Sequence, residues 1–168
     1  MALSMYQASV PVFQRMLGAL DKILDKAAAY AEERKIDPAV LIGARLYPDM
    51  FPLSRQVQIA TDHAKGASAR LAGVAVPSFE DTEKTFPELK ARMGKTLSFI
   101  ATLKAAQIDG SEGRDISLKA GPRELSFKGQ DYLLFFALPN FYFHTTTAYG
   151  ILRHNGVGIG KLDFLGAA

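Results

Sequence analysis

The sequence of 168 residues contains no cysteine and no tryptophan. Without cysteine there is no disulfide, no thiolate ligand for a metal and no cysteine nucleophile. A metal ion would have to be held by histidine, aspartate, glutamate, asparagine or tyrosine side chains. Histidine is also scarce, with three in the chain, and the site predictions below centre on these three residues.

The sequence also lacks a strong excess of charge and a long hydrophobic run. The net charge is +3, and no basic stripe alternates with aromatic residues, so we do not expect nucleic-acid binding. The most apolar window, residues 132–143, is too short to span a membrane and is interrupted at Pro139. The first residues lack the basic region and long apolar core of a secretory signal. We therefore expect a cytoplasmic protein with no membrane segment.

Length and composition predict one domain, residues 1–168. The apolar content of 48% and the charged content of 22% are ordinary for a globular protein, and the chain is long enough to bury a core. There is no internal repeat, low-complexity tract or linker.

The first half of the chain predicts two helices, because apolar residues recur at three- and four-residue steps. The first runs from Ser4 or Ser9 to about Lys35, and its start stays open because both serines suit a helix start. The second begins near Pro52, which suits a first turn, and ends at Gly73.

A third helix is predicted from Thr85 to about Gln107, after an acidic connection that begins at Val74. Thr85 and Glu88 have the spacing of a capping box. The period then changes to alternation over residues 114–129, which predicts a short β-hairpin. An isolated hairpin is marginally stable, so we expect it to lie against one end of the helices.

The fourth predicted helix covers residues 129–156, the most apolar stretch, and ends at Asn155-Gly156. Pro139 should kink it one turn before His144 and free a carbonyl near Phe135; plain curvature is the alternative. Residues 157–168 carry enough apolar side chains to pack onto the body. The expected fold is all-α, a four-helix bundle with a short β-hairpin between the third and fourth helices.

Polar residues on the inner faces of two helices mark the candidate site. Asn140 and His144 lie four residues apart on one face of the fourth helix, and His63 lies on the side of the second helix shared with Gln56. Buried polar groups need partners. His154 lies in a last turn, where we expect it to cap the helix.

Three interpretations of the His63 and His144 pair stay open. In the first, both rings are neutral and hydrogen-bonded to carbonyls and to hydroxyls such as those beside His144. In the second, both bind a divalent metal, with Asn140, Asp62, Gln56 or a tyrosine as further ligands. In the third, His63 is a general base in a small pocket. No serine or cysteine nucleophile has a recognisable elbow or oxyanion context, so an acyl-transfer triad is not expected.

The chain resembles a bacterial family of unknown function in the superfamily of DinB-like and YfiT-like helical bundles. The similar stretches are MYQASVPVF from residue 5, PDMFPLSRQVQIATDHAKG from residue 48, LAGVAVPSFEDTEKTF from residue 71 and PNFYFHTTTAYGILRHNGVGIGKLDFLG from residue 139. The resemblance implies a DinB-like bundle, often a homodimer. Several members of the superfamily bind a divalent metal through one histidine on the second helix and a His-x-x-x-His pair on the fourth.

Carried onto this sequence, the resemblance places His63 at the second-helix ligand and His144 at the first position of the fourth-helix pair. The second position of the pair is Ala148. The implied site for zinc, nickel, manganese or iron therefore lacks one of its three histidines. The metal-dependent thiol transfer of better-known relatives is for that reason not expected of this chain.

These observations favour a polar pocket around His63, Asn140 and His144 that binds a metal or a small molecule, and they do not decide whether the protein is an enzyme. The alternative is a non-enzymatic bundle whose surface forms a dimer or binds a partner, with purely structural histidines.

Overall fold

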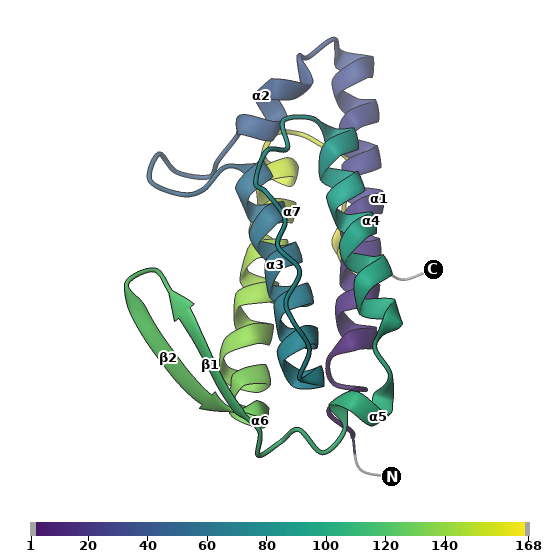
Figure 1. Ribbon diagram of the computed structural model, residues 1–168. Helices are drawn as coiled ribbons and strands as arrows, with labels where there is room; N and C mark the ends of the chain where they lie inside the picture. The colour runs from purple at the N-terminus through teal and green to yellow at the C-terminus, as the bar shows by residue number, and fades with distance from the viewer. Residues whose placement is uncertain (1–2, 167–168) are drawn as a thin grey trace.

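Four long helices form the body of the structure, a computed structural model that describes residues 3–166. They are α1 (Val10–Arg34), α3 (Leu53–Ala72), α4 (Phe86–Thr102) and α7 (Leu138–His154). In Figure 1, α1 and α7 run in one direction and α3 and α4 in the other. The predicted all-α four-helix bundle with a β-hairpin is confirmed.

Shorter elements connect the long helices. They are α2 (Pro38–Gly43), α5 (Ala105–Ile108), strands β1 (Asp115–Ala120) and β2 (Arg123–Lys128), α6 (Gly129–Asp131), the π-helical segment η1 (Tyr132–Ala137) and α8 (Lys161–Leu165). None of the helices within residues 3–166 is both long and apolar enough to cross a membrane.

The helix starts follow the predicted capping residues. Thr85 Oγ1 accepts from the Glu88 amide at 3.3 Å, and Glu88 Oε2 accepts from the Thr85 amide at 3.0 Å, which is the predicted capping box of α4. Helix α1 takes the later of its two starts, after Ser9. Ser4 and Gln7 still exchange two hydrogen bonds, but in the turn that precedes the helix.

Two stretches differ from the prediction. The third helix ends at Thr102 rather than near Gln107, because Leu103 adopts an extended conformation and turns its side chain into the core, leaving α5 as a separate turn. Residues 38–43, for which no helix was predicted from the sequence, form α2. Asp37 caps this short helix by accepting from the Ala39 amide at 2.9 Å.

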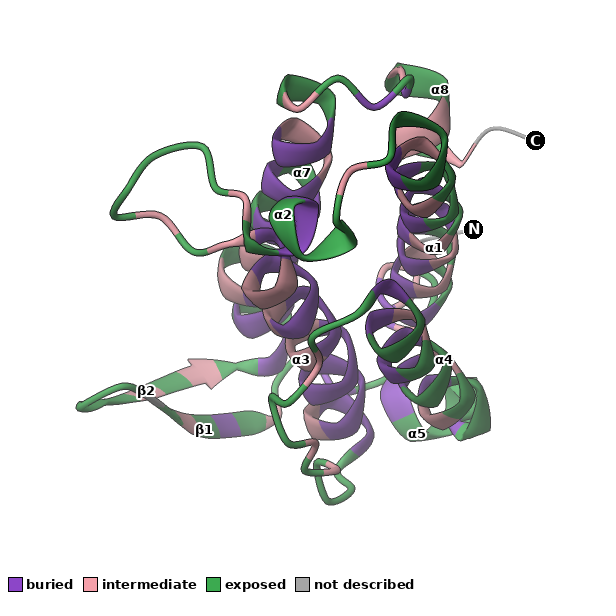
Figure 2. Cartoon of the chain, turned by 90° about the horizontal axis from the view of Figure 1, so that it is seen from above, coloured by how far each residue is buried: buried purple, intermediate pink, exposed green. Residues whose placement is uncertain are grey.

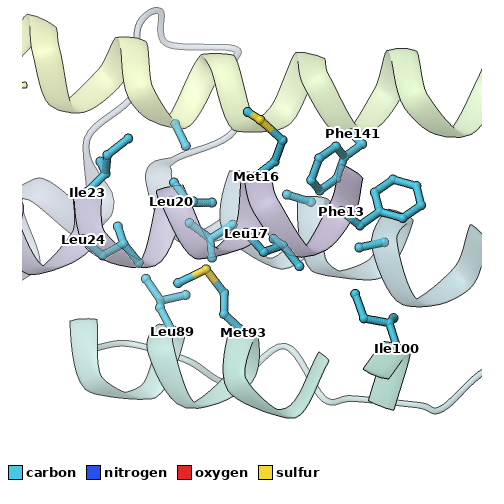
Figure 3. Close-up of a cluster of buried hydrophobic side chains, with 14 of the residues drawn as sticks. Phe13, Met16, Leu17, Leu20, Ile23, Leu24, Leu89, Met93, Ile100 and Phe141 are labelled. Atoms are coloured by element: carbon cyan, nitrogen blue, oxygen red, sulfur yellow. The ribbon is translucent and has the colours of Figure 1, made fainter. Parts of the chain in front are cut away.

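The core lies between the inward faces of the four long helices. Figure 2 shows buried residues turned toward the centre on each of them, while the hairpin is largely exposed. Side chains of α1, α4 and α7 interdigitate in Figure 3, and the Phe13 and Phe141 rings meet edge to face at 4.9 Å. Around the bundle, α3 packs against α4 on one side and α7 on the other.

The predicted hairpin forms with the predicted turn. Ile116 pairs with Phe127 and Leu118 with Leu125, around Gly121-Pro122. Ile116 is buried, but the hairpin does not cover the end of the bundle as expected. It projects beside α3 and α7 (Figure 1), because Phe127 packs onto Tyr132 and Phe136, at the start of the long helix that ends as α7.

The helix around Pro139 widens rather than merely curving. Since Pro139 has no amide hydrogen, the regular ladder cannot close on it, and the six residues Tyr132–Ala137 form a π-helical turn. Asn140 Nδ2 donates to the Phe136 carbonyl at 2.7 Å. The helix is therefore irregular before Pro139, as predicted, and the Asn140 side chain satisfies the Phe136 carbonyl in the π-helical turn.

The C-terminal segment packs onto the body, as predicted. Val157 and Ile159 are buried. Helix α8 lies on α1, where Lys26 and Asp163 form an ion pair at 2.6 Å and Arg15 Nε donates to the Leu165 carbonyl at 3.0 Å.

The connection from α3 to α4 must run back along the bundle, because these helices are parallel (Figure 1). Arg92 of α4, with 1% of its side chain exposed, holds this segment. Its guanidinium donates to Thr61 Oγ1 at 2.8 Å, the Glu80 carbonyl at 2.9 Å, Glu83 at 3.1 Å and Asp62 at 2.8 Å, and lies 2.9 Å from Asp81.

Replacing Arg92 with methionine should lower the free energy of unfolding by about 2–4 kcal/mol, because three carboxylates lose their shared cation. The loss stays below that of a fully buried pair, since the Asp62 and Asp81 side chains remain 36% and 38% exposed. Urea unfolding measures the change, and Lys95→Met, an exposed substitution on the same helix, is the matched control. Equal stability of the two variants would contradict the structural role of Arg92.

Candidate functional site

The candidate site lies where α3 and α7 pack against each other. Ala60, Ala64 and Ala67 of α3 are fully buried, and these small side chains allow the two helices to approach closely. The approach brings His63 of α3 and His144 of α7 together. Their ring centroids are 6.0 Å apart and their planes differ by 15°, so the imidazoles are nearly parallel.

Gln56 determines the tautomer of His144. The Gln56 amide nitrogen donates to the Phe51 carbonyl at 3.0 Å, so its oxygen faces His144 and accepts from Nδ1 at 2.7 Å. His144 Nδ1 therefore carries a hydrogen, and in the neutral ring Nε2 is an acceptor. The partner of His144 is thus a side-chain amide one helix away.

The hydroxyls beside His144 do not satisfy it, contrary to the expectation of local partners. Thr145 Oγ1 donates to the Phe141 carbonyl at 3.0 Å, and Thr147 Oγ1 donates to the Phe143 carbonyl at 2.7 Å. Such bonds to the preceding turn are common for threonine in helices. The prediction of local partners was wrong because a threonine hydroxyl in a helix bonds most readily to a backbone carbonyl one turn earlier, not to the side chain beside it.

Both imidazoles are held in the neutral form. The pKa of His63 is lowered to about 4: burial is the largest cause, the charges of His144 and Arg70 also lower it, and Asp62 opposes the shift. Burial also lowers the pKa of His144 to about 4, with a smaller contribution from Arg55. At neutral pH each ring therefore has one donor nitrogen and one acceptor nitrogen.

A pocket of about 540 Å³ opens beside His63, between α3, η1, α7 and the hairpin. Asn140 also lines it, whereas His144 lies deeper, with 8% of its surface exposed. The other lining residues are Phe51, Arg55, Ile59, Asp62, Arg70, Leu118, Lys119, Gly121, Tyr132 and Phe136. A volume of this size is in the range of small-molecule sites.

The ring nitrogens of His63 face accessible space. Among residues 3–166, no hydrogen bond joins the His63 side chain to another protein group, and Ser111 Oγ is the one fully buried side-chain polar atom without a partner. His63 instead contacts the Phe136 ring edge to face at 5.8 Å. Its donor and acceptor are therefore available to a molecule in the pocket.

The protein donors fall short of the metal site that the resemblance implies. Ala148, at the position of the third histidine, is fully buried. Asp62, the nearest carboxylate in sequence, is bound to Arg92 and Lys65. Within residues 3–166 no group of three or more histidine, aspartate or glutamate side chains is placed to hold an ion. Metal binding by this site stays a prediction, and we derive no chemistry from it.

His154 is separate from this site. It is exposed in the last turn of α7, and the side chain that closes this end is Asn155, whose Nδ2 donates to the Ile151 carbonyl at 2.8 Å. The predicted stop at Asn155-Gly156 is confirmed, with Gly156 at a φ of 91°. The capping role predicted for His154 thus belongs to its neighbour, because an amide on a short side chain folds back onto the helix.

Sequence reasoning missed several residues of the pocket wall. Arg70 lies two turns after His63 on α3, a spacing that places both on one helix face and that the sequence contains. Leu118 and Lys119 come from the hairpin. No local pattern reveals their part in the pocket, because it depends on where the hairpin docks.

Fold and site define a DinB-like helical bundle with a histidine-lined pocket on the side that the hairpin covers. The chain belongs to the family described as a domain of unknown function (DUF1993), whose model matches residues 5–165. It is similar to a DinB family member protein from Shewanella denitrificans, with 42% sequence identity, a TM-score of 0.87, and coverage of 97% of this chain and 92% of that chain. Comparison with curated proteins gave no match. The resemblance found in the sequence is confirmed.

The two neutral histidines predict a pH-dependent stability. In the unfolded chain each titrates near 6.5, whereas in the folded protein the pKa is about 4. Between these values the unfolded state binds more protons, so the free energy of unfolding should fall as the pH is lowered, by up to about 1.4 kcal/mol per pH unit and histidine.

Urea unfolding at about pH 7 and about pH 5 measures this dependence. The double variant His63→Gln and His144→Gln should show a much smaller change, while His154→Gln, at an exposed position, should behave as the wild type. A wild-type stability that does not change over this range would show that the rings are not held neutral.

Proposed function

We propose that this protein binds a small organic molecule in the pocket beside His63. One observation carries the proposal: His63 lines a pocket of about 540 Å³ with a neutral ring that bonds no protein group among the described residues. The ring nitrogens face the pocket and have no partner within residues 3–166 to give up, so a ligand that offers a donor or an acceptor can bond them directly.

The other lining residues support a ligand with polar and apolar parts. Asn140 uses its amide nitrogen on the Phe136 carbonyl, which leaves its amide oxygen as an acceptor. Phe136, Tyr132 and Ile59 supply apolar surface. His144 supports the site from behind, because its ring, fixed by the bond to Gln56, lies nearly parallel to the His63 ring at 6.0 Å.

His63 can also accept a proton from a bound molecule, since its ring is neutral at physiological pH. This property is compatible with general-base chemistry, but binding is the function that the pocket supports most directly. Catalysis would require a reacting ligand, which binding experiments identify first.

A fragment screen by thermal shift, followed by calorimetry of the hits, tests the proposal. Compounds that bind beside His63 should bind His63→Phe, which has no hydrogen-bonding group, about five- to tenfold more weakly, because each lost hydrogen bond contributes about 1 kcal/mol. His154→Gln, which replaces an exposed histidine outside the pocket, should bind as the wild type does.

Two outcomes would contradict this function. If the hits bind the wild type and His63→Phe equally, they bind elsewhere on the protein. Stoichiometric zinc, nickel, manganese or iron in tag-free protein, lost in both His63→Ala and His144→Ala, would instead favour the metal-binding alternative.

The second candidate function is homodimerisation, and an uncharged surface of α7 favours it. No charged residue occurs from Tyr132 to Leu152. Leu46, Pro139, Tyr142, Phe143, Thr146, Thr147 and Gly150 line an open groove of about 510 Å³ there, and Phe143 is 58% exposed. A twofold interface brings a patch against its own copy, which an uncharged patch permits without repulsion. We propose a second copy of this chain as its partner.

Sedimentation velocity of the wild type should then show a dimer, and Phe143→Asp should shift it to a monomer, because the new charge is buried against its twin. Leu162→Asp, at a position on α8 that is 69% exposed, is the matched control and should remain dimeric. A monomeric wild type, or a dimer that persists in Phe143→Asp, would overturn this candidate.

A further inference from the structure

Arg70 is a cation of the pocket wall whose position is fixed by its neighbours. Its Nη1 donates to the Tyr132 hydroxyl at 3.2 Å, and its guanidinium carbon lies 6.0 Å from the centre of the Tyr132 ring. Tyr132 is 1% exposed and stacks on Phe136 at 5.9 Å. The guanidinium is therefore seated on a rigid aromatic support rather than extended into solvent.

Gly66, one turn before Arg70 on α3, makes room for this position. A Cβ atom at residue 66 would lie 2.6 Å from Arg70 Nη1. Side chains on a helix lean toward its N-terminus, so the guanidinium occupies the space above Gly66, in the direction of His63. Any larger residue at position 66 displaces the charge.

The charges around the pocket do not cancel. Arg55 is paired with Asp81, and the one carboxylate that lines the pocket, Asp62, is already bound by Arg92 and Lys65. Arg70 and Lys119 also line it. Within residues 3–166 no carboxylate lies within ion-pair distance of either one.

The rest of the wall is apolar. Phe51, Ile59, Leu118, Tyr132 and Phe136 surround the polar groups. A ligand that satisfies this wall needs an apolar body of about the size of an aromatic ring, together with a negative group that reaches Arg70. The planar guanidinium fork suits two anionic oxygens at once.

We propose that the pocket selects small molecules with a terminal carboxylate or phosphate on an apolar body, with Arg70 as the primary anion-binding residue and Lys119 of the hairpin as the second. The inference rests on the proposed binding function. His63 is neutral, so we expect it to form a hydrogen bond with an uncharged polar group of the same ligand rather than with the anionic group. Lys119, which is exposed, contributes less than Arg70 because solvent screens it.

Probes that share a phenyl group and differ in charge test the selection. Phenylacetate and phenyl phosphate are the anions, phenylacetamide is the neutral analogue and 2-phenylethylamine is the cation. Calorimetry measures the affinities, and the imidazole NMR signals of His63 show whether a probe occupies the pocket. We expect the anions to bind at least about tenfold more tightly than the amide, the ratio that a charge-assisted bond supports. The two anions distinguish carboxylate from phosphate preference.

Arg70→Gln should remove most of the preference for anions over the amide and leave only the smaller contribution of Lys119. Arg153→Gln removes the same charge from an exposed position at the end of α7 and should change neither affinity. Gly66→Ala is a second variant that keeps every charged group and favours the helix. It should weaken anion binding several-fold at unchanged or higher stability, because its methyl group displaces the guanidinium.

The outcomes separate this inference from the function on which it rests. If the amide or the amine shifts the His63 signals and binds as tightly as the anions, or if Arg70→Gln retains the full preference, the anion selection is overturned and the binding pocket stands. If no probe of any charge shifts the His63 signals, the inference and the binding function both fall.

Discussion

The close packing of α3 against α7 is the constraint on which the rest of the structure depends. Buried alanines on α3 allow the two helices to approach, and the hydrogen bond from His144 to Gln56 crosses the contact at 2.7 Å. An imidazole buried this far must have a partner, and an amide held by the Phe51 carbonyl provides one of defined orientation. The same packing buries His144 and much of the His63 ring, so both rings stay neutral.

The pocket exists because two irregular features lie beside this regular contact. The π-helical turn Tyr132–Ala137 adds a wider turn just before Pro139, where Phe136 and Asn140 line the pocket. The hairpin docks on the same turn through Phe127 and supplies the outer wall. A π-helical turn is uncommon, and a two-stranded hairpin is marginally stable unless it packs against a helix. The aromatic packing of Phe127, Tyr132 and Phe136 stabilises both features.

Much of the fold could be predicted from sequence, because each long helix carries its own periodicity and end signals. Thr85 with Glu88, Gly73, and Asn155 with Gly156 all act as their local chemistry dictates. The candidate site was predicted less completely. His63, Asn140 and His144 do lie together. Arg70 and Lys119 were missed, because one is an ordinary helix-surface arginine by pattern and the other belongs to a hairpin whose docking no local signal specifies.

The sequence by itself determined the four long helices, most of the signals at their ends, the hairpin and the family, since these depend on neighbours a few residues apart and on side-chain periodicity. Only the tertiary structure decided which groups meet: Gln56 rather than a threonine as the partner of His144, Arg92 as the tie for the α3 to α4 connection, and Arg70 over Gly66 at the pocket wall. The physical reason is that hydrogen bonds and charges act over a few ångströms, and distances between residues far apart in the chain are set by how whole helices pack.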